Sequence, residues 1–236
     1  MAITFNSAGT PVYAFNSTVT PTAPTDVAGT GLILVTGELA GSDTISTPSG
    51  WAALDLVSGS PQVAQVRAFG LTATGSDTMP TISWGNQWAF AVVLAFNGLD
   101  PSFTAAFTPA GRQTNETNVI QGPAVNRTPS QNSALALFLG QRNKTSTTDG
   151  VTYTAPSNFT MGVQGQHTGT SVSFGVTYWI QTTATTVVAN LGMTGSASES
   201  AVQTTQGVYI GILAAAAAAI PFPPTSKGGM NVQVCQ

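Results

Sequence analysis

Charged side chains are scarce in this sequence. It has 6 Lys and Arg and 9 Asp and Glu among 236 residues, so charged residues make up 6% of the chain, against about 25% in an average soluble domain. Nucleic-acid binding needs clustered Lys and Arg, so this composition argues against a nucleic-acid partner. Hydrophobic residues still reach 42%, near the usual ~45–50%, so the chain can form a core and is not of the disordered class.

Cysteine and histidine are almost absent, with one of each. Cys235 precedes the last residue, so no disulfide forms within the chain, and a free thiol or an interchain disulfide remain as alternatives. His167 stands in a Gly-rich stretch that predicts an exposed loop. These two residues cannot supply the roughly four ligands of a zinc site or a catalytic base with a rigid nucleophile. We therefore expect no enzymatic activity, no catalytic residue, no metal and no cofactor.

Carboxylates are few as well. Glycosidase chemistry needs two of them about 5–10 Å apart, and Glu38, which ends an apolar segment, and Asp55 are the residues to test for a hydrolase. Loop carboxylates and carbonyls could also bind calcium. The aspartates stand singly, without Asp-x-Asp spacing, which is typical of turn residues: Asp26, Asp43, Asp55, Asp77, Asp100 and Asp149.

Long apolar segments and a leader pattern are also missing. The longest apolar run, Val208–Phe222, is mostly Ala and contains Pro221, and it is shorter than the roughly 18 residues of a membrane span. The first residues lack a basic region followed by an apolar one. We expect synthesis in the cytoplasm and no membrane insertion.

The sequence does contain the periodicity of β-strands. Short apolar or alternating segments are separated by clusters of Gly, Pro, Ser, Asp and Asn, which are turn residues. The clearest segments are Gly31–Glu38, Gln62–Leu71, Gln87–Phe96 and Ser171–Ile180. No stretch combines helical spacing with caps, so the pattern predicts an all-β protein.

This strand pattern occurs twice, in the same order. The matched segments are Gly31–Glu38 with Ser133–Gly140, Thr47–Trp51 with Ala155–Phe159, Val66–Phe69 with Val176–Trp179, and Ala89–Leu94 with Val208–Leu213. Two facing four-strand halves would bury both apolar faces. We predict one antiparallel, jelly-roll-like β-sandwich over residues 31–213, with duplicated halves at 31–100 and 133–213. The Thr-, Asn- and Pro-rich stretch Leu99–Gln131 is predicted to form crossover loops.

Two arms are predicted outside the sandwich. Residues 1–30 contain one expected strand, Ile3–Asn6, followed by a Thr- and Pro-rich stretch, and residues 214–236 form the C-terminal arm. Polar extensions with isolated apolar residues often become ordered on a neighbouring subunit. The candidate assembly contacts are Phe222, Met230, Val232, Val234 and Cys235.

Four tryptophans are candidates for a ligand platform, because jelly rolls often carry lectin sites. Trp51 and Trp179 align with Phe159 and Phe69 in the repeat, so we interpret them as core residues. Trp84 and Trp88 flank a Gly-Asn turn and are the better candidates for a platform. A core position at the end of a hairpin is the alternative for both.

Five segments carry a resemblance to a known family: Gly31–Val35, Pro48–Trp51, Ala73–Ser76, Ser83–Trp84 and Ala91–Asp100. In this order the chain resembles the jelly-roll domain family of tailed-bacteriophage virion proteins, of the capsid decoration or tail appendage type, which also occurs in some bacterial surface proteins. The resemblance spans about residues 30–213. Its motifs are structural corners and core strands, and they bring no catalytic residues with them.

The resemblance implies a non-enzymatic virion protein. Low charge, two arms and the absence of shaft repeats favour an exterior capsid decoration (cement) protein over a tail fibre. We expect symmetric copies in the virion, with the chain itself and the major capsid protein as partners. The alternative is a receptor- or carbohydrate-binding module of a phage tail or bacterial surface, with a host glycan as partner.

Overall fold

The computed structural model describes residues 2–15, 18–25, 28–39, 45–54, 64–84, 88–114, 119–143, 151–167, 172–196 and 205–216. This part of the chain contains β-strands and no helix. Every strand pair is antiparallel. The prediction of an all-β protein is confirmed.

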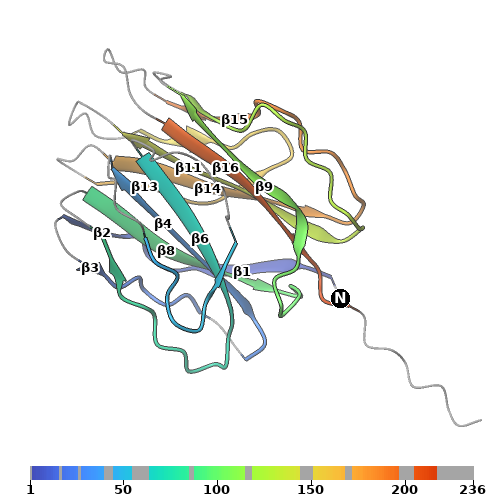
Figure 1. The fold of residues 1–236 in the computed structure, drawn as a ribbon, viewed down its shortest axis with the longest axis horizontal. Coiled ribbons are helices and arrows are strands. Elements are labelled where there is room, and N and C mark those ends of the chain that lie inside the picture. Colours follow the sequence, from blue (N-terminus) through green and yellow to red (C-terminus); the bar gives the residue numbers. More distant parts are fainter. Residues whose placement is uncertain are drawn as a thin grey trace, which may run out of the picture.

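Two large sheets lie face to face (Figure 1). The first has the order β1-β8-β4-β6-β5, with β2 also paired to β8. Its strands are β1 (Thr4–Ala8), β2 (Val12–Phe15), β4 (Gly31–Leu39), β5 (Ala52–Ala53), β6 (Ala64–Thr72) and β8 (Trp88–Asn97). The second sheet has the order β13-β14-β11-β16-β9. Its strands are β9 (Ala105–Thr114), β11 (Ala134–Asn143), β13 (Thr160–Gln166), β14 (Val172–Gln181) and β16 (Thr205–Leu213).

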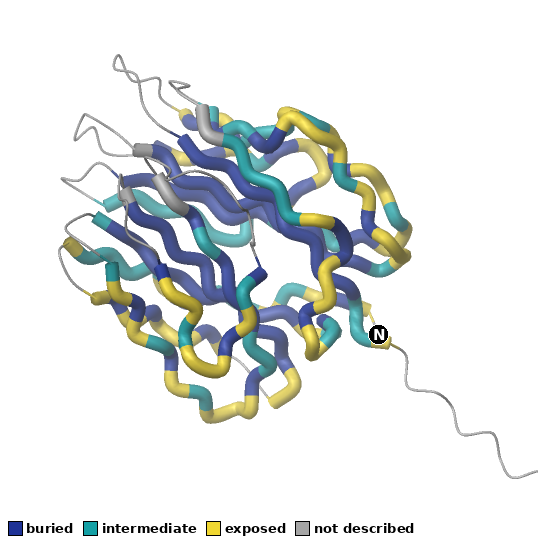
Figure 2. Tube along the Cα trace, viewed as in Figure 1, coloured by how far each residue is buried: buried dark blue, intermediate teal, exposed yellow. Residues whose placement is uncertain are grey.

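The central strands are buried on both faces. One hydrophobic cluster fills the space between the sheets, and two more cover their outer faces. Two small sheets contribute to these outer clusters: β3 (Thr18–Val19) with β7 (Ile82–Ser83), and β10 (Val119–Gln121) with β15 (Gly192–Gly195) and β12 (Tyr153–Thr154). Figure 2 shows the central strands as an almost unbroken buried layer. Double-sided burial explains why β8 and β16 read as continuous apolar runs instead of alternating ones.

Each half of the chain forms one sheet, and the two halves have the same strand order. The first half gives β8-β4-β6-β5 and the second gives β16-β11-β14-β13. The corners Pro48–Trp51 and Pro156–Phe159 also match, because in each the fourth amide donates to the first carbonyl, at 3.1 and 3.0 Å. The third residue has a positive φ in both, 81° at Gly50 and 69° at Asn158, as a type II turn requires.

The connectivity differs from the predicted jelly roll. Large-sheet strands before Asp100 all belong to the first sheet, and those after it belong to the second. The chain therefore crosses between the sheets once, whereas the two Greek keys of a jelly roll interleave their strands in both sheets. Hydrophobic periodicity indicates which strands are buried, but it does not indicate which strands are neighbours in a sheet.

The predicted loop and arm regions contain paired strands. Within Leu99–Gln131, β9 pairs with β16 and β10 pairs with β15. Within residues 1–30, β1 and β2 pair with the two ends of β8, and β3 pairs with β7. The described N-terminal residues thus belong to the sandwich and do not form a separate arm.

At the other end of the chain, the described residues stop soon after β16. Ala214 bridges Leu99, and the amide of Ala215 donates to the carbonyl of Gly98 at 2.8 Å. Residues 217–236 lie outside the described residues. So do all five predicted assembly contacts: Phe222, Met230, Val232, Val234 and Cys235.

Candidate functional site

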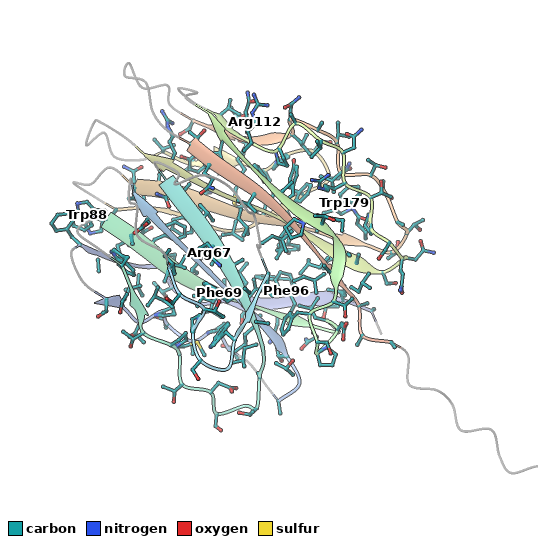
Figure 3. All side chains as sticks on the ribbon, in the orientation of Figure 1. Arg67, Phe69, Trp88, Phe96, Arg112 and Trp179 are labelled. Atoms are coloured by element: carbon teal, nitrogen blue, oxygen red, sulfur yellow. The ribbon has the colours of Figure 1, made fainter. Side chains whose placement is uncertain are left out.

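One long edge of the sandwich, where β2 and β8 meet β13, carries four clustered rings: Tyr13, Phe15, Trp88 and His167. The centroids of Trp88 and His167 are 4.7 Å apart, and those of Phe15 and Trp88 are 5.0 Å apart. The Tyr13 ring is 5.3 Å from that of His167. We call these four residues the aromatic edge. Trp88 and His167 are half-buried and Phe15 is 46% exposed, and Figure 3 shows Trp88 at the periphery of the molecule.

Strand register places these rings together. Phe15 lies directly opposite Trp88 in the β2–β8 ladder, and Tyr13 lies opposite Phe90, and such cross-strand aromatic pairs stabilise a sheet. Strand β13 of the second sheet can lie close to Tyr13 because Gly165 of this strand has no side chain. A Cβ there would collide with the Tyr13 hydroxyl.

Tyr13 is the member of the aromatic edge whose acidity is changed by burial and whose ring contacts the core. Desolvation raises the pKa of Tyr13 from 10.0 to about 12. The Tyr13 ring is 6.1 Å from that of Phe174, which stacks on Phe90 at 4.0 Å with an interplanar angle of 6°. The aromatic edge is therefore the outer end of a ring series that begins in the central core.

The two predicted platform tryptophans lie in different surroundings. Trp88 belongs to the aromatic edge, whereas Trp84 packs, partly buried, against the outer-face cluster of the first sheet. Trp51 and Phe69 lie in the same outer cluster, and their counterparts Phe159 and Trp179 lie in that of the second sheet. Trp51 is buried, as a core residue should be, whereas Trp179 is half-buried and packs against its cluster.

Sequence reasoning missed three members of the aromatic edge. Tyr13 and Phe15 fell in the predicted arm, although the short apolar and aromatic run Val12–Phe15, which follows Pro11, was a strand signal that could have found them. His167 was expected in an exposed loop. It lies half-buried at the end of β13, where its amide donates to the carbonyl of Val172 at 3.2 Å.

The opposite long edge is open. There β5 has only two residues, and it faces β9 and β16 across an apolar cleft of about 120 Å³. The described residues that line the cleft carry no charge: Ala53, Leu54, Phe103, Ala105, Pro109, Ile210, Gly211 and Ile212. An apolar cavity of about 150 Å³ is large enough to bind benzene. The apolar cleft therefore has the size and chemistry to accept one apolar side chain.

Polar side chains connect the two sheets inside the sandwich. The Gln206 side-chain oxygen accepts a hydrogen bond from the amide of Val66 at 2.6 Å, and the Gln141 amide group donates to the carbonyl of Glu38 at 2.8 Å. Both glutamines are buried. Because a buried polar group is costly to leave unpaired, these bonds fix the alignment of one sheet over the other.

The candidate hydrolase carboxylate does not face a groove. Glu38 is fully buried on β4. Asp55, its proposed companion, lies outside the described residues.

Two aspartates stabilise turns, as predicted. Asp77 accepts from the amide of Thr74 at 2.7 Å, and Asp100 accepts from the amides of Ser102 and Thr104 at 3.1 and 3.2 Å. Hydrogen bonding, first from the Thr104 side chain, lowers the pKa of Asp100. The other four, Asp26, Asp43, Asp55 and Asp149, lie outside the described residues. In the described ranges, no group of three or more His, Cys, Asp or Glu could hold a metal ion.

The fold and these sites define an all-β protein with two large facing sheets, one aromatic edge and one open, apolar edge. No protein-family model, curated protein or solved structure matches the chain. Over the residues described, no helix is long and apolar enough to cross a membrane.

Proposed function

We propose that the protein is a non-enzymatic structural subunit of a bacteriophage virion, an exterior capsid decoration protein that assembles in symmetric copies. The resemblance of segments between Gly31 and Asp100 to phage virion proteins supports this location. The equal strand order of the two sheets supports a duplicated origin of the sandwich. The surface chemistry supports the assembly role.

Exposure of Phe15 is the observation that carries the proposal. It is one of three large hydrophobic residues exposed in the described part of the chain, and the only aromatic one among them. Its ring leans on Trp88, and exposed apolar patches mark contact surfaces, where aromatic residues are enriched. A neighbouring virion protein, either a second copy or the major capsid protein, covers the aromatic edge.

Low charge suits such a contact. When two subunits associate, removing an unpaired charged side chain from water costs roughly several kcal/mol. With 15 charged residues in 236, neighbouring subunits can pack closely while few ions lose water. Neutral polar groups at the rim then supply hydrogen bonds.

Copy number on virions tests this proposal. Phe15→Ser should lower the occupancy of virions about 30-fold, because an interface anchor is worth about 2 kcal/mol. Val188→Ser is the matched control, since Val188 is 60% exposed and lies outside the aromatic edge. Quantitative mass spectrometry of purified particles measures occupancy, and circular dichroism verifies folding. Equal occupancy for wild type and both variants would contradict the proposal.

Trp88 supports a second candidate, the receptor- or carbohydrate-binding module. A half-buried indole between Phe15 and His167 offers an apolar face with a polar group beside it, which is how aromatic side chains meet partly wet ligands. Tryptophan fluorescence distinguishes the carbohydrate-binding module from the capsid decoration protein. Saturable quenching of tryptophan fluorescence by a host glycan, lost in Trp88→Ala and kept in Trp84→Phe, would favour the carbohydrate-binding module.

A further inference from the structure

The apolar cleft opens beside the last described residues of the chain. Ile210 and Ile212 of β16 line it, and the amide of Leu213 donates to the carbonyl of Thr104, next to the cleft residues Phe103 and Ala105. The strand that forms one wall of the cleft therefore leads directly into the C-terminal segment, residues 217–236.

Chain length allows that segment to return to the cleft. From Ile212 to Ala216 the backbone spans at most about 14 Å, and from Ala216 to Phe222 it can span about 20 Å, at roughly 3.3–3.6 Å per residue. Phe222, the one aromatic residue of the segment, is thus within reach. Tethering over so short a distance gives an effective concentration of about millimolar.

The chemistry of the two surfaces also matches. From Thr205 to Ser226 the sequence has no charged residue, and none of the described residues that line the cleft is charged. Pro221, Pro223 and Pro224 flank Phe222 and restrict its backbone to extended conformations. Such preformed segments bind aromatic-lined grooves at low entropic cost, and among the described lining residues Phe103 supplies an aromatic ring, with Pro109 as an apolar neighbour in the lining.

We propose that the C-terminal segment binds back onto its own chain, with the Phe222 ring seated in the apolar cleft. Phe222 then closes the open edge, as the aromatic edge closes the opposite one. This inference gives Phe222 a contact within one chain, in place of the contact with a neighbouring subunit that the sequence predicted for it. The proposed virion role is argued from Phe15 and does not depend on Phe222.

A spin-label experiment on the full chain tests this. The chain carries Cys235→Ser, 4-fluorophenylalanine at position 222, and a nitroxide on Ala105→Cys, an exposed cleft residue. We expect the fluorine resonance to be broadened, equally in concentrated and dilute samples. With the nitroxide on Val188→Cys, the matched control away from the cleft residues, the resonance should stay sharp.

Two results would overturn the proposal. A sharp resonance with the label at position 105 means that Phe222 is not in the cleft. Broadening when spin-labelled chains without fluorine are mixed with fluorinated chains without label means that the occupant is the segment of a second copy. The chemical shift in urea gives the undocked reference, and because Ala105→Cys is a small change at an exposed site, folding is retained. If the protein is found on virions while Phe222 lies outside the cleft, only the cleft proposal fails and the proposed function is retained.

Discussion

The two long edges of the sandwich are built differently from equivalent parts. At the aromatic edge the corner strand of the second half, β13, has seven residues, and β1 and β2 extend the first sheet beside β8. At the open edge the equivalent strand of the first half, β5, has two residues and leaves the apolar cleft facing β9 and β16. In the described part of the chain, one topology thus gives two different edges, which differ in the length of the corner strand and in the strands added beside β8.

The largest expected effect is a difference in unfolding free energy between a core substitution near the aromatic edge and one at the open edge. Phe174 is fully buried and stacks on Phe90 near the aromatic edge, so Phe174→Ala should cost about 3–5 kcal/mol of unfolding free energy. Phe103 lines the cleft and is 8% exposed. Phe103→Ala should cost less, because the space it leaves joins a cleft that already exists. Urea unfolding compares the two variants, and equal losses would show that the open edge is packed as tightly as the closed one.

A smaller effect concerns the side-chain hydrogen bonds that hold the two sheets together, between β6 and β16 and between β4 and β11. Gln206→Ala removes the acceptor of the Val66 amide, and an unpaired buried donor costs about 1–3 kcal/mol. Gln141→Ala is the matched control. It deprives a carbonyl, that of Glu38, of one donor, and carbonyls tolerate this better than amides do.

Hydrogen exchange at the Val66 amide gives a local readout for these glutamine variants. We expect faster exchange in Gln206→Ala and little change in Gln141→Ala. Slow exchange at Val66 in both variants would mean that the hydrogen bond from the Val66 amide to Gln206 does not hold β6 to β16.

Local chemistry explains which features were predictable. The turn at Pro48–Trp51 and its counterpart at Pro156–Phe159 depend on residues close together in sequence, so both corners and their aromatic residues were found. The apolar runs of β4, β8, β11 and β16 could be recognised for the same reason. In each of these strands the apolar composition by itself indicates that the strand is buried.

Pairing at the edges could not be predicted in the same way. β9 contains Pro109 and Gly111, residues that weaken a strand pattern and are tolerated at an edge, so its sequence resembles a loop. β2 is short, and its partner β8 lies more than seventy residues away, by the Val12–Ala91 pair. The aromatic edge depends on that distant pairing, and this is why Trp88 was the only one of its four residues predicted to belong to a ligand platform.

The smallest effect tests how dry the aromatic edge is. Burial raises the pKa of Tyr13 from 10.0 to about 12, so between these values the unfolded chain loses its proton while the folded chain keeps it. Stability should therefore be unaffected below about pH 10 and should fall as pH rises toward about 12. Tyr13→Phe should reduce this fall, measured as urea midpoints across the alkaline range. Tyr178→Phe should reduce it less, because its pKa is raised by weaker burial. An unchanged alkaline slope in Tyr13→Phe would show that water reaches the hydroxyl and that this edge is as open as the other.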